Sequence, residues 1–128
     1  MQIHKHISLS GLRGFLVQFD DEQSQVLIDT IHADLHVKLR EFREAFETED
    51  REKMQNLCKS IEQMARPFQL DLLVDDVLKT QEHLATGPIN KSQISEFLNL
   101  FNHIVTALKK LKNKGFRTDR MKTKKKDR

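Results

Sequence analysis

The segment from Met54 to Leu84 constrains the fold most, because two helical stripes of apolar residues flank Pro67 in it. Apolar side chains recur every three or four residues on both sides of the proline: Met54, Leu57, Ile61 and Met64 before it, and Leu70, Leu73, Val77 and Leu84 after it. This spacing places each set on one face of a helix. Proline removes a backbone donor and disfavours helical geometry in the preceding residue, so we expect the chain to turn there. The segment predicts a hairpin of two amphipathic helices.

Two further apolar stripes flank this hairpin. The stripe before it predicts a helix over residues 22–46, capped by Asp20 or Asp21. The stripe after it follows a cap at Asn90 and ends at Gly115, a residue type that favours helix ends. Four striped helices with short connections are typical of an antiparallel up-down four-helix bundle.

Composition supports an all-α fold. Only four glycines and two prolines occur in 128 residues, which leaves few turns for a many-stranded β fold. We expect a four-helix bundle over residues 20–115, preceded by an arm or a short helix across the bundle end in residues 1–19. Residues 116–128 carry too few apolar side chains to offset the entropy of ordering them, so we expect a disordered tail.

The net charge of +3 is distributed unevenly along the chain. Residues 115–128 contribute +5 and the remaining residues contribute −2, so the basic character belongs to the tail. Its candidate electrostatic residues are Arg117, Arg120, Lys122, Lys124, Lys125 and Lys126. Such a segment can bind nucleic acid or an anionic surface, and it can equally serve as a solubilising terminus.

Cysteine content and hydropathy predict a soluble cytoplasmic protein. The single cysteine, Cys58, excludes an internal disulfide framework and suits a reducing compartment. No run approaches 18 apolar residues, and no early apolar segment precedes a small-residue cleavage site, so we expect no transmembrane segment and no signal peptide.

The hairpin resembles the histidine-phosphotransfer (HPt) domain family. In that family the motif runs roughly hydrophobic-x-His-x-Leu-Lys-Gly, with an aromatic or apolar residue and a glycine about ten positions after the histidine. The apolar positions of this pattern are filled here by Leu57, Ile61, Phe68, Leu70 and Leu73. The resemblance covers residues 23–111, and it implies a four-helix bundle that takes part in two-component signalling.

Four departures from the motif bear on function. Lys59 stands where the phosphoaccepting histidine is expected, and it lies off the apolar stripe, so it should be exposed. Glu62 replaces the lysine that the family favours, and Gln63 and Gln69 replace its two usual glycines. A lysine cannot relay a phosphoryl group as an imidazole does, and the other changes also oppose phosphotransfer.

The resemblance and its departures together favour a binding module over an enzyme. We expect it to dock on a response-regulator receiver domain or a histidine kinase without accepting phosphate. The candidate partner-binding surface surrounds Lys59 and comprises Gln55, Asn56, Lys59, Glu62, Gln63 and Arg66. Lys59 would face the acidic pocket of a receiver domain.

Two other functions remain open. One is an active phosphotransfer protein that uses a non-standard histidine, although no other histidine lies in a comparable motif. The other is a helical adaptor that binds nucleic acid or an anionic membrane through its basic tail.

His32 and His36, four residues apart on one helix, are a weak candidate for a metal site. No motif indicates a cofactor.

Overall fold

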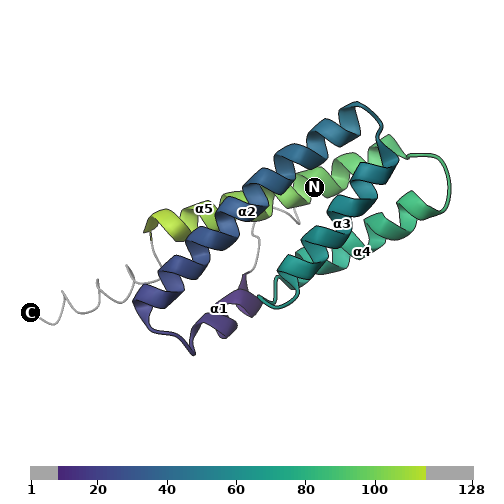
Figure 1. The fold of residues 1–128 in the computed structure, drawn as a ribbon. Coiled ribbons are helices and arrows are strands. Elements are labelled where there is room, and N and C mark those ends of the chain that lie inside the picture. Colours follow the sequence, from purple (N-terminus) through teal and green to yellow (C-terminus); the bar gives the residue numbers. More distant parts are fainter. Residues whose placement is uncertain (1–8, 115–128) are drawn as a thin grey trace, which may run out of the picture.

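The computed structural model describes residues 9–114, and over this range it contains helices and no strand (Figure 1). The helices are α1 (Ser10–Leu16), α2 (Asp21–Glu47), α3 (Arg51–Ala65), α4 (Asp71–Ala85) and α5 (Lys91–Lys114). The prediction of an all-α fold is confirmed. Within the described range, no helix combines the length and the apolar character needed to cross a lipid bilayer.

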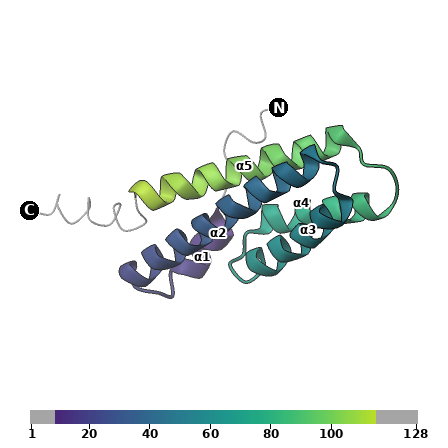
Figure 2. The same cartoon turned by 45° about the horizontal axis from the view of Figure 1, so that its top comes forward.

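Each of the four long helices packs against two others. α2 contacts α3 and α5, and α4 contacts the same two helices. Figure 1 and Figure 2 show the chain reversing direction between consecutive long helices. The four helices therefore surround one shared apolar interior.

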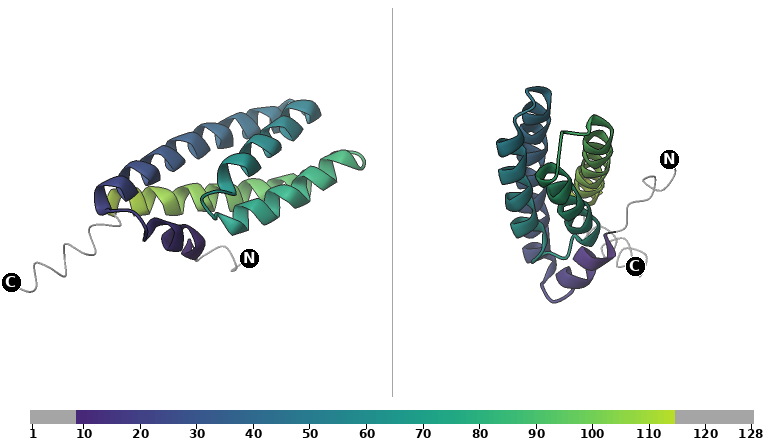
Figure 3. Two further views of the ribbon diagram at one scale, coloured as in Figure 1. Left: turned by 60° about the horizontal axis from the view of Figure 1, so that its bottom comes forward. Right: turned by 90° about the vertical axis from the view of Figure 1, so that its right-hand side faces the viewer.

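The long helices differ in length, and this difference determines where α1 lies. α2 has 27 residues and α5 has 24, whereas α3 and α4 have 15 each. At about 1.5 Å per residue, the α3–α4 hairpin reaches only about 22 Å along helices of about 36–40 Å. Because α3 follows the end of α2 and α4 precedes the start of α5, the hairpin covers only those halves. α1 lies beyond the turn of the hairpin, beside the remaining halves (Figure 3).

The core is continuous from α1 to the far end of the hairpin. Leu12 and Leu16 of α1 are fully buried in it. Phenylalanine supplies the largest core side chains, as the composition predicts. Phe42 and Phe97 pack edge to face with ring centroids 5.1 Å apart, and Phe97 and Phe101 lie 5.6 Å apart. Such aromatic contacts add to the free energy of burial itself.

Side-chain caps begin three of the long helices, and two of them, at Asp20 and Asn90, are predicted by the sequence. Asp20 forms a capping box with Gln23 at the start of α2, so Asp20 is the cap rather than Asp21. The Asp50 carboxylate accepts from the Lys53 amide at 3.1 Å, and the Asn90 side-chain oxygen accepts from the residue three positions on, at 3.2 Å. These bonds satisfy amides that have no partner within the helix.

The turn before α3 and the turn after it each contain a residue with a left-handed backbone conformation, and neither residue is glycine. Glu49 has φ 54° between α2 and α3, and Gln69 has φ 59° between α3 and α4. At the second turn, the Leu70 amide donates to the Ala65 carbonyl and the Gln69 amide donates to the Arg66 carbonyl. This pair of bonds is the Schellman motif, which usually has glycine at the left-handed position.

The chain turns between α3 and α4 at Gln69, two residues after Pro67, where the sequence predicts the turn. The α-helix α3 ends at Ala65, and α4 begins at Asp71. Pro67 lies inside the last turn that the Schellman motif closes, so it does not form the corner itself. The corner is Gln69, whose left-handed backbone cannot continue a helix.

Residues 10–16 form the short helix, not the extended arm, of the two forms expected for this region. α1 is held against the hairpin turn by the edge-to-face contact of Phe15 with Phe68, whose ring centroids lie 5.6 Å apart. It is held against α2 by the Ser24 hydroxyl, which donates to the Leu16 carbonyl at 3.2 Å. The closest approach is at Gly11, where an added Cβ would lie 2.3 Å from the Gln69 carbonyl oxygen.

We expect opposite effects from alanine at the two glycines of α1. Gly11→Ala should lower the free energy of unfolding by about 1–2 kcal/mol, because the new methyl group would collide with backbone at the turn. Gly14→Ala should raise it by about 0.5–1 kcal/mol, because no atom lies within 4 Å and alanine favours helix. Urea denaturation of both variants measures the difference, and equal effects would contradict the packing of α1.

Candidate functional site

The candidate surface lies on the side of α3 that points away from the core. The inward side chains of this helix are Met54, Leu57, Cys58, Ile61 and Ala65, and all five are buried. Lys59 lies on the opposite side and is exposed, as the sequence predicts. Asn56 and Gln63 are also exposed, one turn away on either side of it.

Three of the six predicted partner-binding residues, Gln55, Glu62 and Arg66, form contacts within the protein. Gln55 is partly buried, and its side-chain amide donates to the Leu84 carbonyl at the end of α4, 3.4 Å away. Arg51 donates to the same carbonyl and to the Gly87 carbonyl. Gln55 therefore helps to join α3 to the end of α4.

Glu62 and Arg66 contact each other. The Glu62 carboxylate accepts from Arg66 at 2.5 Å and from the Gln81 amide of α4 at 3.4 Å. The hydrogen bond from Arg66 is the main reason why the pKa of Glu62 lies below its usual value. Glu62 and Arg66 pair with each other, and Lys59 forms no ion pair with another side chain of residues 9–114.

The C-terminal part of this surface is hollowed. A surface depression with a volume of about 390 Å³ is lined by Glu62, Gln63, Arg66 and Pro67. It lies one turn from Lys59 along α3 and borders the Gln69 turn. Four of the predicted residues, Asn56, Lys59, Gln63 and Arg66, thus share an exposed surface with a concave end.

The weak metal candidate, His32 and His36, consists of two stacked rings. Their centroids lie 5.9 Å apart with an interplanar angle of 24°. Within residues 9–114 there is no group of three or more His, Cys, Asp or Glu side chains placed to hold a metal ion. The pair lacks the further ligands that a structural or catalytic metal site requires.

The environment of His32 is unfavourable to its charged form. Burial lowers the pKa of His32 below its usual 6.5, and the charges of Lys112, His36 and Lys109 lower it further, against the opposing carboxylate of Asp29. Its Nδ1 atom is buried and has no hydrogen-bond partner within the described range. His32 therefore favours the neutral form in the folded protein.

Cys58 lies deeper than the half-buried position that its place beside the stripe predicts. Its side chain is fully buried, and burial raises the pKa of the thiol to about 12. A buried thiol with a raised pKa is a poor nucleophile. Cys58 is therefore a packing residue.

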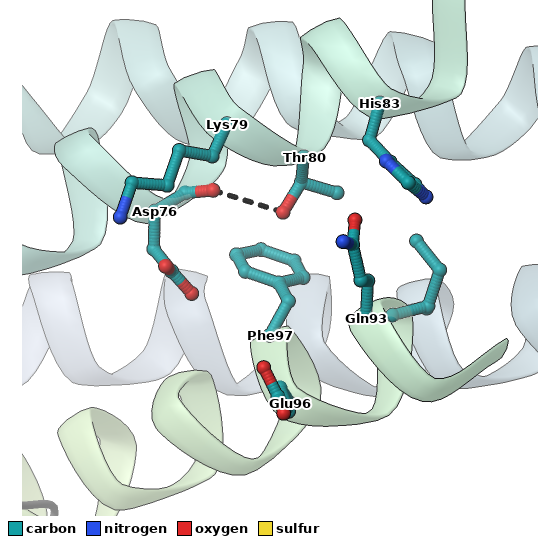
Figure 4. Close-up of a pocket in the computed structure, with 8 residues that line it drawn as sticks. Asp76, Lys79, Thr80, His83, Gln93, Glu96 and Phe97 are labelled. Carbon is teal, nitrogen blue, oxygen red and sulfur yellow. Dashed lines mark hydrogen bonds between the residues drawn. The ribbon is translucent and has the colours of Figure 1, made fainter. Parts of the chain in front are cut away.

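A cleft between α4 and α5, which sequence reasoning missed, brings polar side chains of both helices together (Figure 4). Of the four pairs of long helices in contact, α4 and α5 pack least closely. The cleft has a volume of about 340 Å³ and is lined by Asp76, Lys79, Thr80, His83, Gln93, Ile94, Glu96 and Phe97. In the sequence, Asp75 and Asp76 indicate an ordinary solvated helix surface, and no motif connects them to α5.

Six predicted residues of the basic tail, Arg117 to Lys126, lie outside the residues that the structure describes. The tail hypothesis therefore stays a prediction from the sequence.

Comparisons with protein-family models, with curated proteins and with solved structures found no match for the chain.

The pKa of His32 predicts how stability depends on pH. Because the folded protein holds this pKa below the unfolded value, the unfolded chain binds more protons once the pH falls below 6.5. The free energy of unfolding should therefore decrease between about pH 7.5 and about pH 5.5, and His32→Gln should show a smaller decrease. His103→Gln is the control, because it removes a histidine of α5 that is not among the groups lowering the pKa of His32. A wild-type pH dependence in His32→Gln would show that another group is responsible.

Proposed function

We propose that the protein is an HPt-like docking module that binds a receiver domain or a histidine kinase and does not accept the phosphoryl group. The observation that carries this proposal is the exposed Lys59 on the outward side of α3, where the HPt motif has its phosphoaccepting histidine. The chain would then keep the scaffold and the binding surface of such a domain. It would lack the group that receives phosphate.

The arrangement of the helices supports the proposed scaffold. We propose that α2 to α5 form an antiparallel up-down four-helix bundle of the HPt type, since each packs against two of the others. α1 would then be an additional helix that covers the part of α2 and α5 beyond the hairpin. The expected bundle of residues 20–115 would accordingly include a contribution from residues 9–16.

The turn between α3 and α4 gives independent support. The HPt motif usually has glycine about ten positions after its histidine, and Gln69 stands at this position here. Gln69 has a left-handed φ of 59°, a conformation that glycine adopts without strain and other residues adopt at a cost of about 1 kcal/mol. A backbone that favours glycine, at a position where the family has glycine, agrees with a shared turn.

Charge on the α3 surface favours an acidic partner. Glu62 and Arg66 form a pair at 2.5 Å, so their charges largely cancel for a distant partner. Lys59 then supplies the net positive charge at the centre of the surface, and Asn56 and Gln63 beside it are uncharged. The acidic pocket of a receiver domain is complementary to such a surface.

The histidines of the described range lie on other helices. His32 and His36 belong to α2, His83 to α4 and His103 to α5, so α3 presents no imidazole. His103 Nδ1 lies 2.7 Å from the Asn99 carbonyl oxygen, within its own helix. A receiver that docks on α3 would therefore find no phosphoacceptor in the place where the family has one.

Charge reversal at Lys59 tests the docking surface. Lys59→Glu should weaken binding to a cognate receiver domain at least about tenfold, because it places a carboxylate against the acidic pocket. Lys53→Glu is the matched control: it makes the same change on the same helix, at another exposed position. Titration calorimetry against the receiver domains of the same organism measures both affinities.

If Lys59→Glu and Lys53→Glu weakened binding equally, the partner would not bind at the surface around Lys59. A wild-type protein that binds no receiver domain and no histidine kinase would contradict the proposed function itself. Incubation with a radiolabelled phosphorylated receiver distinguishes docking without phosphate transfer from active phosphotransfer. We expect no acid-labile label on the protein, and label that disappears on substitution of one histidine would favour the phosphotransfer alternative.

A further inference from the structure

Basic side chains of α2 and α5 gather along the line where these two helices pack, which we call the α2–α5 seam. Figure 1 and Figure 2 show the end of α5 beside the start of α2. Gln25 of α2 joins the two helices, because its side-chain amide donates to the Lys112 carbonyl at 3.2 Å. His32 lies about two turns further along α2, on the same side of the helix as Gln25. Lys109 and Lys112 lie one turn apart on α5, and the charges of both act on His32.

The two ammonium groups of the seam are not neutralised by carboxylates. Neither Lys109 nor Lys112 forms an ion pair with a side chain of residues 9–114. The carboxylate that acts on His32 is Asp29, and it accepts a hydrogen bond from the Gln25 amide at 3.2 Å. Two positive charges therefore face one negative charge here. A bound anion would relieve the repulsion between the two ammonium groups.

The two imidazoles add charge and hydrogen-bond donors when they take up protons. His36 is exposed, and its ring stacks on that of His32 with the centroids 5.9 Å apart. The Nδ1 atom of His32 is buried and has no hydrogen-bond partner in the part of the chain that the structure describes. A protonated ring donates from both nitrogens, whereas a neutral ring donates from one. The charged groups that act on His32 are Asp29 and His36 from α2, and Lys109 and Lys112 from α5.

This combination of groups favours a ligand with two negative charges at one point. A metal cation would be repelled by the two ammonium groups. A phosphate monoester carries close to two negative charges near neutral pH and has three strong acceptor oxygens, so it can accept from several donors at once. Each phosphodiester group of a nucleic acid carries a single charge, so it gains less from the convergence of several cationic groups.

We propose that the α2–α5 seam binds a small molecule that carries a phosphate monoester, with Lys109, Lys112 and His32 as the groups that contact it. His36 stacks behind His32 and adds positive charge when it is protonated. Binding therefore becomes tighter as the two imidazoles take up protons. This site is independent of docking through α3, since none of its residues belongs to that helix.

Methyl phosphate and dimethyl phosphate test the proposal, because they are similar in size and differ in charge. Titration of each into the full-length protein at constant ionic strength, followed by the NMR signals of the imidazoles, reports both affinity and location. Methyl phosphate should bind at least about fivefold more tightly than dimethyl phosphate, with saturable shifts of the His32 ring. Equal affinities would indicate a diester of nucleic acid or lipid as the ligand and would overturn the proposal. Absence of saturable shifts at His32 would also overturn it.

Sulfate tests the coupling to protonation, because it stays a dianion while the histidines titrate. Its affinity should be at least about fivefold higher at about pH 5.5 than at about pH 8, since an anion stabilises the protonated imidazoles. For the same reason, saturating sulfate should raise the pKa of His32 as measured by NMR. A sulfate affinity that does not change with pH would show that the histidines take no part in the site.

Charge-removing variants of α5 locate the site. Lys109→Gln and Lys112→Gln should each weaken the binding of methyl phosphate about three- to fivefold. Lys110→Gln is the matched control, because it removes the same charge from an exposed position of the same turn and is not among the groups that act on His32. If the control weakened binding as much as the other two variants, the attraction would be diffuse and the site would be overturned.

Discussion

The close approach of α1 to the turn between α3 and α4 is the contact on which the rest of the structure depends. Gly11 has no side chain, so the Gln69 carbonyl can approach the backbone of α1 to a distance that no Cβ allows. This approach lets Leu12 and Leu16 enter the core beyond the end of the hairpin. Without it, the short hairpin would leave the apolar surfaces of α2 and α5 uncovered over nearly half their length, at a cost of about 25 cal/mol per Å².

The same contact bears on the α3 surface, because it fixes the turn of the α3–α4 hairpin. The other end is held by Arg51, which donates to the Leu84 and Gly87 carbonyls. α3 therefore presents Lys59 on a helix that is anchored at both ends, and rigid elements place a binding surface better than loops do.

Much of the fold could be predicted from the sequence, because its signals are local. The caps at Asp20 and Asn90 and the exposure of Lys59 follow from residue types and helical spacing. The left-handed Gln69 could not be predicted, since a non-glycine residue in that conformation carries no sequence signal. The cleft also escaped prediction, because it depends on how two helices are spaced in the folded protein.

Native-state hydrogen exchange of the unmodified protein tests the central claim most directly, namely that α1 is part of the core and closes onto the hairpin turn. The Arg13 amide donates to the Leu9 carbonyl in α1, and the Leu70 amide donates to the Ala65 carbonyl in the turn. If the claim is right, both amides exchange through one shared opening whose free energy approaches that of global unfolding. Exchange of the Arg13 amide at the rate of an unprotected loop, while Leu70 stays protected, would contradict it.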